Sequence, residues 1–391
     1  MEVLVLGGGY AGVTVARHLE WSLPGEVDLT VVDPAARHLV QHELHRLVRD
    51  PYRVDDVTVP FSSLFSRARF VRGRVTELDE AAGVATLADG AERRFDLAAV
   101  CLGARTAYYD LPGVEVHSTP LKSVDDAMAI RERFLELLDR GEGRVVVGGA
   151  GLSGIQVAGE LSALAADHGV GDAVEVVLLE QADAVAPGFP AHFSASVHET
   201  LDEEGVDVRT GLTVTGATDA VVELEGGSLA YDQLVWTGGI RGPAPFGDER
   251  PLVPATLRRG ERTFVVGDAA RVVDRDGELL PATAQAAVAA AGVAARNIDR
   301  LVRHARRGGV FEPRLETVSF EPRGWIVTVG DRTVAQVGPL VFRDAAALAL
   351  KTAVGAGYLT SVGAVRQAAG LVEDEVGVVT RPGRRSRPRR R

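Results

Sequence analysis

The sequence predicts an α/β protein in which one parallel-sheet domain is interrupted by a second domain of the same kind and followed by a small C-terminal segment. Three observations predict this fold. A glycine-rich turn follows an apolar strand at residues 7–12, the same pattern returns at residues 149–154, and a third apolar strand at residues 263–266 precedes an alanine-rich helix. A chain of 391 residues, 46% hydrophobic and 25% charged, is long enough for two or three folded domains.

The first glycine-rich turn has the spacing of a nucleotide-binding fingerprint. Residues 1–6 predict a strand, residues 13–19 predict a helix, and a second strand at residues 27–32 ends in an acid. In this pattern the first glycine allows a tight turn, the second lets a pyrophosphate approach the backbone, the third lets the helix pack closely, and the acid binds a ribose hydroxyl. We therefore expect a nucleotide to contact Gly7, Gly9, Tyr10, Ala11, Gly12 and Asp33.

The second turn repeats this pattern in the middle of the chain. It follows a strand at residues 144–148, opens a helix over residues 155–165, and precedes a strand that ends in Glu180. The Glu180 carboxylate favours NADH, because it would repel the 2′-phosphate of NADPH by about 1 to 4 kcal/mol at about 4 Å. No arginine lies between residues 181 and 188 to offset this repulsion. We expect the second nucleotide to contact Gly149, Gly151, Gly154 and Glu180.

Each turn is also followed by a similar β-rich stretch. The separation is 142 residues between the first glycines of the two turns and 138 residues between Gly73 and Gly211. Gly103 and Gly238 follow the last strands of the two stretches, and we expect both beside the nucleotides. Two copies of one nucleotide-binding unit imply two nucleotides, which usually serve to hold a hydride donor against a bound acceptor.

The strand at residues 263–266 delivers Asp268 into a glycine-flanked turn, and the helix at residues 283–303 would return the chain to the first domain. The first domain is therefore expected to be discontinuous. The predicted division is residues 1–115 with 246–310 for the first nucleotide domain, 116–245 for the second, 311–380 for a C-terminal hairpin with helices, and 381–391 for a basic disordered tail.

At this point the chain resembles the two-dinucleotide-binding flavoproteins and, more closely, the type II NADH:quinone oxidoreductases. Residues 99–124, with Leu-Pro-Gly and Pro-Leu-Lys-Ser elements, are similar to that family's link between its domains. The resemblance continues at residues 235–242, which are similar to the family's domain-end strand, and at residues 264–270, which are similar to its Val-Gly-Asp motif. Residues 281–287 resemble its quinone-site helix, and residues 324–330 resemble its C-terminal hairpin.

The resemblance implies an enzyme that passes a hydride from NADH to FAD and then two electrons to a membrane quinone, menaquinone or ubiquinone, without pumping protons. It places FAD on the first unit, with Asp268 on the flavin side chain, and NADH on the second. The helix that begins at Ala284, Gln285 and Ala286 would offer N–H groups to the negative charge of the reduced flavin. Gln285 is accordingly a candidate catalytic residue.

Two positions depart from the family pattern. Ala289 stands where the family's quinone motif has a second glutamine. Gln156 stands where the family often has a glutamate, two residues after the last glycine of the second turn. An amide cannot transfer a proton at neutral pH, so an acid–base role would pass to Glu160, one helical turn on, or to water. Gln156 and Glu160 are candidate catalytic residues, with Glu160 as a simple helix-surface residue the alternative.

The histidines and the single cysteine decide whether the chain binds a metal or uses a redox disulfide. His38, His42 and His45 could suggest a metal, but no convincing carboxylate cluster accompanies them, and the family places a His-Leu-x-Gln element at the flavin edge. We expect no metal. One cysteine, Cys101, excludes a redox disulfide and the sulfide:quinone oxidoreductases, which need a cysteine pair. Cys101 is expected to be a small buried hydrophobe.

The C-terminal part suggests a surface for a partner. Residues 340–376 are expected to be helical and rich in small residues, and they would contact either a membrane surface or a second copy in a homodimer. Residues 381–391 hold seven arginines and no acid, so the rest of the chain has 36 bases against 54 acids. An acidic body argues against nucleic acid, whereas the basic tail suits anionic lipid.

No transmembrane helix or signal peptide is expected, which predicts a cytoplasmic protein that lies peripherally on the inner face of the cell membrane. Two other classes remain open. A soluble reductase of a ferredoxin-type or rubredoxin-type protein would carry the same two fingerprints. A non-catalytic flavoprotein would bind both nucleotides but turn over slowly.

Overall fold

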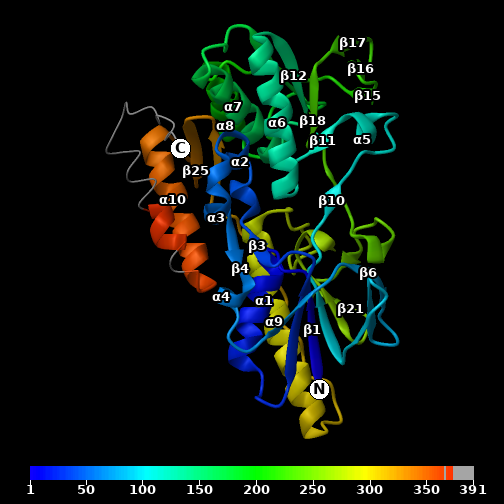
Figure 1. Cartoon of the computed structure of the whole chain (residues 1–391). Helices are drawn as coiled ribbons and strands as arrows, with labels where there is room; N and C mark the ends of the chain where they lie inside the picture. The colour runs from blue at the N-terminus through cyan, green and yellow to red at the C-terminus, as the bar shows by residue number, and fades with distance from the viewer. Residues whose placement is uncertain (365–366, 373–391) are drawn as a thin grey trace.

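The computed structural model describes residues 1–364 and 367–372, and it divides into two lobes with the C-terminal segment at the side (Figure 1). The predicted tail at residues 381–391 and the end of the predicted C-terminal segment lie outside the described residues. No helix in the described ranges is long and apolar enough to cross a bilayer.

The lower lobe of Figure 1 is built on a six-stranded sheet that is parallel except at one edge. Its strands run in the order β21 (Arg258–Arg259), β22 (Thr263–Val265), β9 (Leu97–Val100), β1 (Glu2–Leu6), β2 (Asp28–Asp33) and β5 (Arg69–Arg72). Strand β22 pairs with β9, so the sheet takes strands from both sides of the second unit. This is the discontinuous arrangement expected from the sequence.

The upper lobe repeats this plan with a five-stranded parallel sheet. Its order is β11 (Thr119–Pro120), β18 (Gln233–Trp236), β12 (Gly143–Gly148), β13 (Val174–Leu179) and β14 (Asp207–Arg209). The order β18-β12-β13-β14 matches β9-β1-β2-β5 in the first sheet, so the internal repeat seen in the sequence is a structural repeat. The predicted fold class, with two dinucleotide-binding domains, is confirmed.

Each lobe also carries a three-stranded antiparallel sheet in the stretch that the sequence marks as β-rich. In the first lobe it consists of β6 (Val75–Asp79), β7 (Val84–Leu87) and β8 (Glu92–Arg94), and in the second of β15 (Val214–Ala217), β16 (Val221–Leu224) and β17 (Gly227–Ala230). The chain crosses between the lobes twice, and the two crossings pair as antiparallel strands β10 (Arg105–Thr106) and β19 (Ile240–Arg241).

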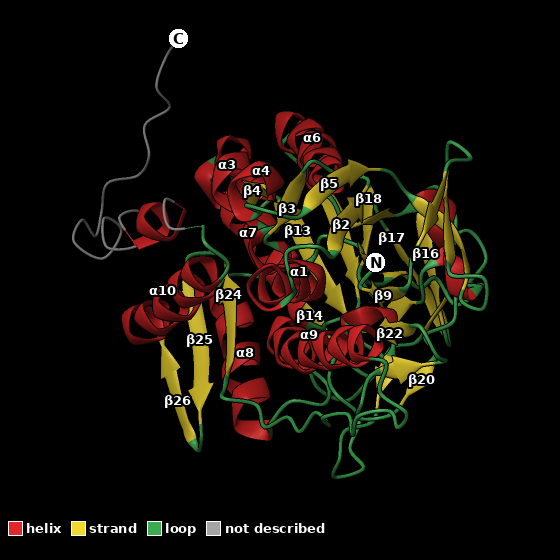
Figure 2. Ribbon diagram, turned by 90° about the horizontal axis from the view of Figure 1, so that it is seen from below, coloured by secondary structure: helices red, strands yellow, loops and turns green. Residues whose placement is uncertain are grey.

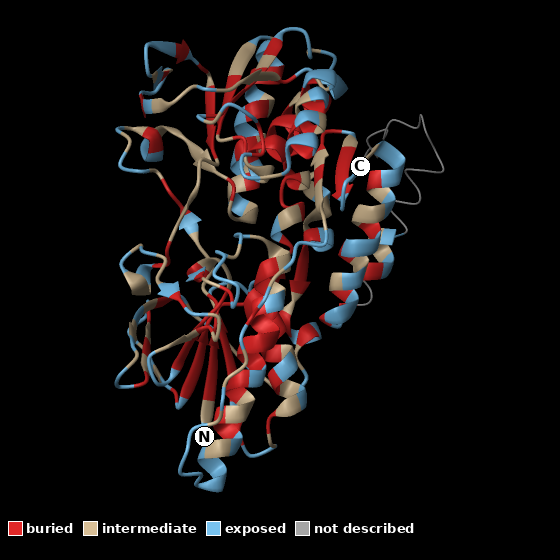
Figure 3. Cartoon of the chain, turned by 180° about the vertical axis from the view of Figure 1, so that it is seen from behind, coloured by how far each residue is buried: buried red, intermediate tan, exposed pale blue. Residues whose placement is uncertain are grey.

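Helices cover the parallel sheets because their buried faces are apolar. In the first lobe α1 (Tyr10–Ser22) and α9 (Ala284–Arg307) pack side by side against the sheet, as Figure 2 shows. The second lobe has α5 (Val114–His117), α6 (Val124–Arg140), α7 (Leu152–Asp167) and α8 (Ala191–Glu203). The strands and the inner helix faces are buried, and the exposed residues line the outer faces (Figure 3).

Residues 37–64 form a string of short elements where the lobes meet. They are β3 (Arg37–Leu39), η1 (Gln41–Glu43), α2 (Arg46–Arg49), η2 (Pro51–Arg53), α3 (Val54–Val57), β4 (Thr58–Pro60) and α4 (Phe61–Leu64). The core of this string joins the core of the second lobe, since Leu44, Leu47 and Val48 pack in one cluster with Ile130 and Ile155. The return to the first lobe passes through η3 (Ala244–Phe246), β20 (Leu252–Val253), η4 (Gly267–Ala269) and β23 (Arg271–Val272).

The C-terminal segment is an antiparallel sheet with a helix beside it. It consists of β24 (Trp325–Val329), β25 (Arg332–Val337), β26 (Leu340–Arg343) and α10 (Asp344–Ser361). The expectation that the chain is helical from residue 340 is wrong for its first four residues. They extend the hairpin because Val341 and Phe342 pair in register with Gln336 and Ala335 on β25.

Candidate active site

The three glycines of the first turn meet different surroundings. Gly7 has a left-handed backbone with φ of 102°, and a side chain there would collide with the carbonyl group of Cys101. A side chain at Gly12 would collide with the carbonyl oxygen of Gly7. At Gly9, in contrast, a Cβ would meet open space. The first and third glycines are therefore needed for packing, whereas the second leaves room for a ligand.

The second turn has the same arrangement. Gly149 has φ of 97°, and a side chain there would collide with Gly238. A side chain at Gly154 would collide with the carbonyl oxygen of Gly149. At Gly151 a Cβ would meet open space. Gly9 and Gly151 are the N-cap residues of α1 and α7, whose first N–H groups have no partner among the described residues. Both turns fit a pyrophosphate, because open helix N-termini bind negative charge.

The two acids at the strand ends hold these turns in place. Oδ2 of Asp33 accepts a hydrogen bond from the Gly8 N–H at 2.7 Å, and Oε2 of Glu180 accepts one from the Ala150 N–H at 2.8 Å. Their second oxygens accept from Ala35 and Ala182. Burial raises the pKa of Asp33, while the hydrogen bonds from Gly8 and Ala35 work against that rise. Each carboxylate keeps lone pairs for ribose hydroxyls.

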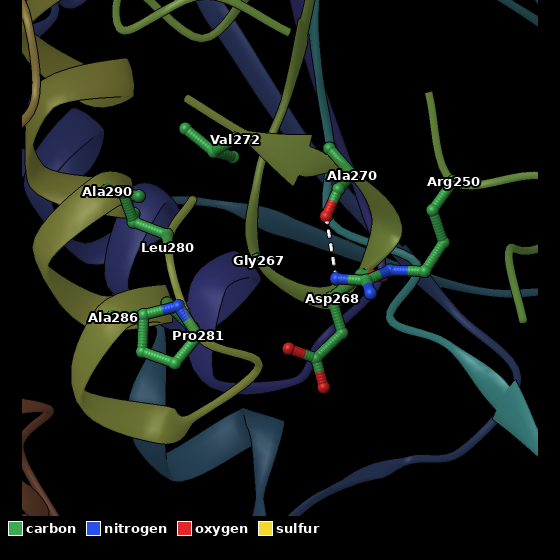
Figure 4. A pocket seen from close by; sticks show the side chains of 10 residues that line it. Arg250, Gly267, Asp268, Ala270, Val272, Leu280, Pro281, Ala286 and Ala290 are labelled. Carbon is green, nitrogen blue, oxygen red and sulfur yellow. Dashed lines mark hydrogen bonds between the residues drawn. The ribbon is translucent and has the colours of Figure 1, made fainter. Parts of the chain in front are cut away.

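The structure brings the third predicted segment against the first turn. Asp268 lies on η4, and the glycine before it packs close to Ala11 on α1. Figure 4 shows Asp268 at a small pocket of about 240 Å³ between η4 and the start of α9. Burial raises the pKa of Asp268, and the positive charges of Lys122 and Arg250 oppose this rise. The Arg250 side chain donates to the carbonyl oxygens of Asp268 and Ala270.

Helix α9 begins where the sequence predicts it. The Thr283 hydroxyl accepts from the Ala286 N–H at 3.3 Å, while the N–H groups of Ala284 and Gln285 have no partner among the described residues. The Gln285 side chain is already engaged, since its amide donates to the Gly324 carbonyl at 3.0 Å and accepts from the Arg323 N–H at 3.4 Å. A catalytic contribution from Gln285 would therefore come from its backbone N–H.

Gln156 and Glu160 lie one turn apart on the buried face of α7. Glu160 is only 5% exposed, so the interpretation as a helix-surface residue is wrong. Burial raises the pKa of Glu160 to about 7, against the opposing charges of Arg49, Lys351 and Arg46. Its Oε1 lies 3.7 Å from Nε2 of His45.

Two histidines of residues 37–45 each form a hydrogen bond with a different tyrosine from another element. His38 contacts the Gly8 carbonyl through Nδ1 at 2.9 Å and the Tyr358 hydroxyl through Nε2 at 3.1 Å. His42 contacts the Tyr10 hydroxyl through Nδ1. Burial lowers the pKa of His38 to about 4, and burial also lowers the pKa of His42. His38 and His42 thus have separate partners, neither nitrogen of His45 has a hydrogen-bond partner among the described residues, and those residues hold no metal-binding cluster.

A buried ion pair beside these histidines was not predicted from the sequence. Oε1 of Glu43 lies 3.1 Å from Nζ of Lys351, and Oε2 lies 3.2 Å from the Arg46 guanidinium. These cations and the neighbouring His42 lower the pKa of Glu43 against the effect of burial. One signal was available: Lys351 is one of only two lysines in the chain, and it stands in an otherwise apolar helix.

A second pocket, of about 290 Å³, opens between residues 40–57 and α10. Its polar side is formed by His42, Glu43, Arg46 and Asp56, and its apolar side includes Val40, Val57, Leu359 and Leu371. Of the remaining predicted residues, Gly103 follows β9 with φ of 67°, and Cys101 is buried, which raises the pKa of its thiol. Ala289 is exposed on α9.

The repeated sheets and the two open glycine turns define an α/β protein with two dinucleotide-binding domains. A family model described as pyridine nucleotide-disulphide oxidoreductase matches residues 1–291, and the chain belongs to this family. Membership supports an oxidoreductase with FAD and NADH as cofactors. The disulphide of the family description has no counterpart here, because the sequence contains one cysteine.

Individual proteins resemble the chain over most of its length. A type II NADH:quinone oxidoreductase of Staphylococcus aureus (strain NCTC 8325 / PS 47) is 26% identical over 332 residues, which are 77% of this chain and 82% of that protein. The structure of NDH2 from Plasmodium falciparum in complex with NADH has a TM-score of 0.83 at 14% identity and covers 97% of this chain and 98% of its own. The sulfide:quinone oxidoreductase from Aquifex aeolicus has a TM-score of 0.77 at 17% identity, with coverage of 97% and 95%.

Proposed function

We propose that this chain is an FAD-dependent oxidoreductase that takes a hydride from NADH and passes two electrons to a membrane quinone without pumping protons. The observation that carries the proposal is the convergence of the two fingerprint helices on one residue. Tyr10 on α1 contacts the His42 side chain, and Gln156 on α7 donates to the His42 carbonyl at 3.3 Å. Nucleotides bound at the two turns would meet at this junction.

In this proposal each nucleotide is held by its own turn. The residues that would hold FAD are Gly7, Gly9, Tyr10, Ala11, Gly12, Asp33, Gly103, Asp268, Ala284, Gln285 and Ala286. Those that would hold NADH are Gly149, Gly151, Gly154, Glu180 and Gly238. When bound, FAD supplies a carrier that accepts a hydride and releases two electrons. The chain contributes position and electrostatics, because the N–H groups at the start of α9 would stabilise the negative charge of a reduced flavin.

The quinone is supported by the name of the S. aureus relative and by the second pocket. The pocket combines an apolar wall with a few polar groups, as sites for small organic ligands do. It adjoins the junction of the fingerprint helices through His42. Ala289 is not among the residues that line this pocket, so the missing second glutamine does not change its wall.

We also propose a peripheral position on the inner face of the cell membrane. The pocket lies under α10, a helix rich in alanine with Val354 exposed on its surface, so a quinone could enter from a membrane beside this helix. The same surface could instead join two copies in a homodimer. Vesicle binding and the measured mass in solution distinguish these two arrangements.

The test follows the flavin absorbance band of the purified protein without oxygen. We expect NADH to bleach the band and menadione, a soluble quinone, to restore it rapidly. Bleaching without recovery would retain a flavin reductase and point to a protein acceptor of the ferredoxin or rubredoxin type. Very slow bleaching would indicate a non-catalytic flavoprotein. A colourless protein that cannot be reconstituted with FAD would refute the proposal.

A further inference from the structure

His42 lies where both fingerprint helices and the acceptor pocket meet. Its Nδ1 contacts the Tyr10 hydroxyl, its carbonyl accepts from Gln156, and its side chain, 40% exposed, lines the pocket of about 290 Å³. The imidazole therefore forms part of the pocket wall and is partly open to solvent. No carboxylate of α7 occupies this point, because Gln156 is an amide.

A buried ion pair stands behind the imidazole. Nε2 of His42 lies 3.4 Å from Oε1 of Glu43, and the same oxygen lies 3.1 Å from Nζ of Lys351, which donates to the Thr328 hydroxyl at 2.8 Å. Glu43 is fixed by these contacts, so it can orient the imidazole and stabilise a positive charge on it. The titratable and charged groups that face His42 are Tyr10 on α1, His38 on β3, Glu43 on η1, His45, Arg46 on α2, Asp56 on α3 and Lys351 on α10.

The proposed reaction needs a proton that the hydride does not supply. Reduction of a quinone to a hydroquinone takes two electrons and two protons, and the hydride from NADH accounts for both electrons and one proton. The second proton comes either from water or from a side chain at the acceptor pocket. Of the side chains that line it, His42 is the one with an ordinary pKa near neutrality.

We propose that His42 is the acid–base residue that gives this second proton to the quinone, with Glu43 and Lys351 as its positioning residues. The inference rests on the proposed function. It assigns to His42 the proton transfer that the amide of Gln156 cannot perform.

The step balances in atoms and charge. After hydride delivery the quinone carries one O–H bond and one negatively charged oxygen. That oxygen forms its O–H bond with the proton of the His42 imidazolium, whose N–H bond breaks and leaves a neutral imidazole. The imidazole stays neutral until the next acceptor becomes negatively charged, when it takes up a proton from solvent. Burial lowers the pKa of the resting imidazole, and the negative charge of the reduced acceptor raises it, so proton uptake accompanies reduction.

The first experiment compares His42→Gln with the wild-type holoprotein by rapid mixing. Loss of a general acid costs about 100-fold to 10,000-fold, so we expect re-oxidation by menadione to slow at least 100-fold and to lose its decline with rising pH. Re-oxidation by ferricyanide, which takes electrons without protons, should stay within about twofold because no proton step is involved. His198→Gln, at a histidine of α8 whose side chain is 41% exposed, is the matched control and should behave as wild type.

The outcomes separate the inference from the proposed function. If menadione re-oxidises the variant as fast as the wild type, His42 is not the proton donor, although the quinone reductase stands. If menadione fails to re-oxidise the wild type, the proposed function fails first. If both acceptors slow equally in the variant, the side chain serves the flavin site as a whole, and the inference is overturned.

A second experiment measures the pKa of His42 without turnover and with the imidazole in place. Histidine Cε1 resonances of the FAD-bound protein report the pKa of His42 by NMR titration. Lys351→Met should raise that pKa and Glu43→Gln should lower it, since Lys351 disfavours and Glu43 favours the charged imidazole. The pH profile of menadione re-oxidation should move in the same two directions. An unchanged pKa of His42 in both variants would refute the positioning role.

Discussion

Glu43 and Glu160 are buried carboxylates with opposite pKa shifts, and their neighbours explain the difference. Glu43 has two cations within 3.2 Å, Lys351 and Arg46, so it remains charged. The His45 ring lies 3.7 Å from Glu160, and neither nitrogen of His45 has a hydrogen-bond partner among the described residues. The charges of Arg49, Lys351 and Arg46 lower the pKa of Glu160 less than burial raises it. Burial therefore dominates at Glu160 and raises its pKa to about 7.

This shift predicts a pH-dependent stability difference between Glu160→Gln and the wild type. An acid whose pKa rises on folding, here from 4.5 to about 7, stabilises the fold below the unfolded value and loses that contribution as pH rises through the folded value. Relative to wild type, the variant should gain up to about 3 kcal/mol between about pH 5 and about pH 8. Urea unfolding at the two pH values measures this gain.

The matched control is Glu136→Gln, an exposed carboxylate on α6. The pH dependence of His45 is present in both the wild type and Glu160→Gln, so it cancels in their difference to first order. If the difference between Glu160→Gln and wild type does not change with pH, Glu160 is ionised in the folded protein and the burial argument is wrong.

The open cradle at Gly151 predicts a binding defect without a folding defect. A methyl group at Gly151 meets open space in the structure, whereas one at Gly154 collides with backbone. We expect Gly151→Ala to fold, to keep FAD, and to weaken NADH about tenfold or more, because the methyl group occupies space that the pyrophosphate needs. Gly154→Ala should lower the melting temperature instead. Fluorescence titration with NADH and thermal unfolding separate the two effects, and equal NADH affinity in Gly151→Ala and wild type would argue against the second site.

At the scale of elements, two N-caps offer a comparison between stability and cofactor binding. Ser123 begins α6 with a capping box, and Thr283 begins α9 beside the Asp268 loop. Either residue changed to alanine should cost about 1 kcal/mol of stability. Only Thr283→Ala should also weaken FAD, since of these two helices only α9 begins at the proposed flavin site. Similar FAD affinity in both variants would separate the start of α9 from the flavin.

Local patterns predicted the repeated elements well. The strand expected to end at Glu180 is β13 (Val174–Leu179). The helices expected at residues 13–19, 155–165 and 283–303 lie within or nearly coincide with α1, α7 and α9. Glycine spacing succeeded because each turn obeys a local steric rule. The helix predicted from small residues failed at β26, because pairing with β25 outweighs the pattern that continues into α10.

The polar junction could not be predicted in the same way. The Glu43–Lys351 ion pair joins residues 308 positions apart, and the hydrogen bond between His38 and Tyr358 spans 320 positions. Periodicity reports only neighbours along one element, so it carries no information on these pairs. The sequence therefore identified the two cradles, while the residues between them emerged from the tertiary structure. The roles of the predicted site residues stay predictions.

For the molecule as a whole, the two lobes are joined by more than the paired crossings β10 and β19. Arg131 on α6 donates to the carbonyls of Val48 and Arg49 at the end of α2, and Arg49 bridges to Asp167 and Asp331. These contacts fix residues 37–64 against the second lobe. The junction at His42 is thus held from both sides, which a hydride transfer between two nucleotides requires.

The charge distribution over the whole chain predicts how it meets a membrane. Seven arginines lie in residues 381–391, whereas the other residues carry 36 bases against 54 acids. Each arginine near an anionic surface contributes about 1 kcal/mol, so a chain ending at residue 372 should bind phosphatidylglycerol vesicles at least about 100-fold more weakly than the full chain. Vesicle co-sedimentation measures this, with phosphatidylcholine vesicles as the control and rising salt expected to release the full chain. Flavin bleaching by NADH should be unchanged by the truncation. Equal binding by the two chains would instead assign attachment to the surface of α10.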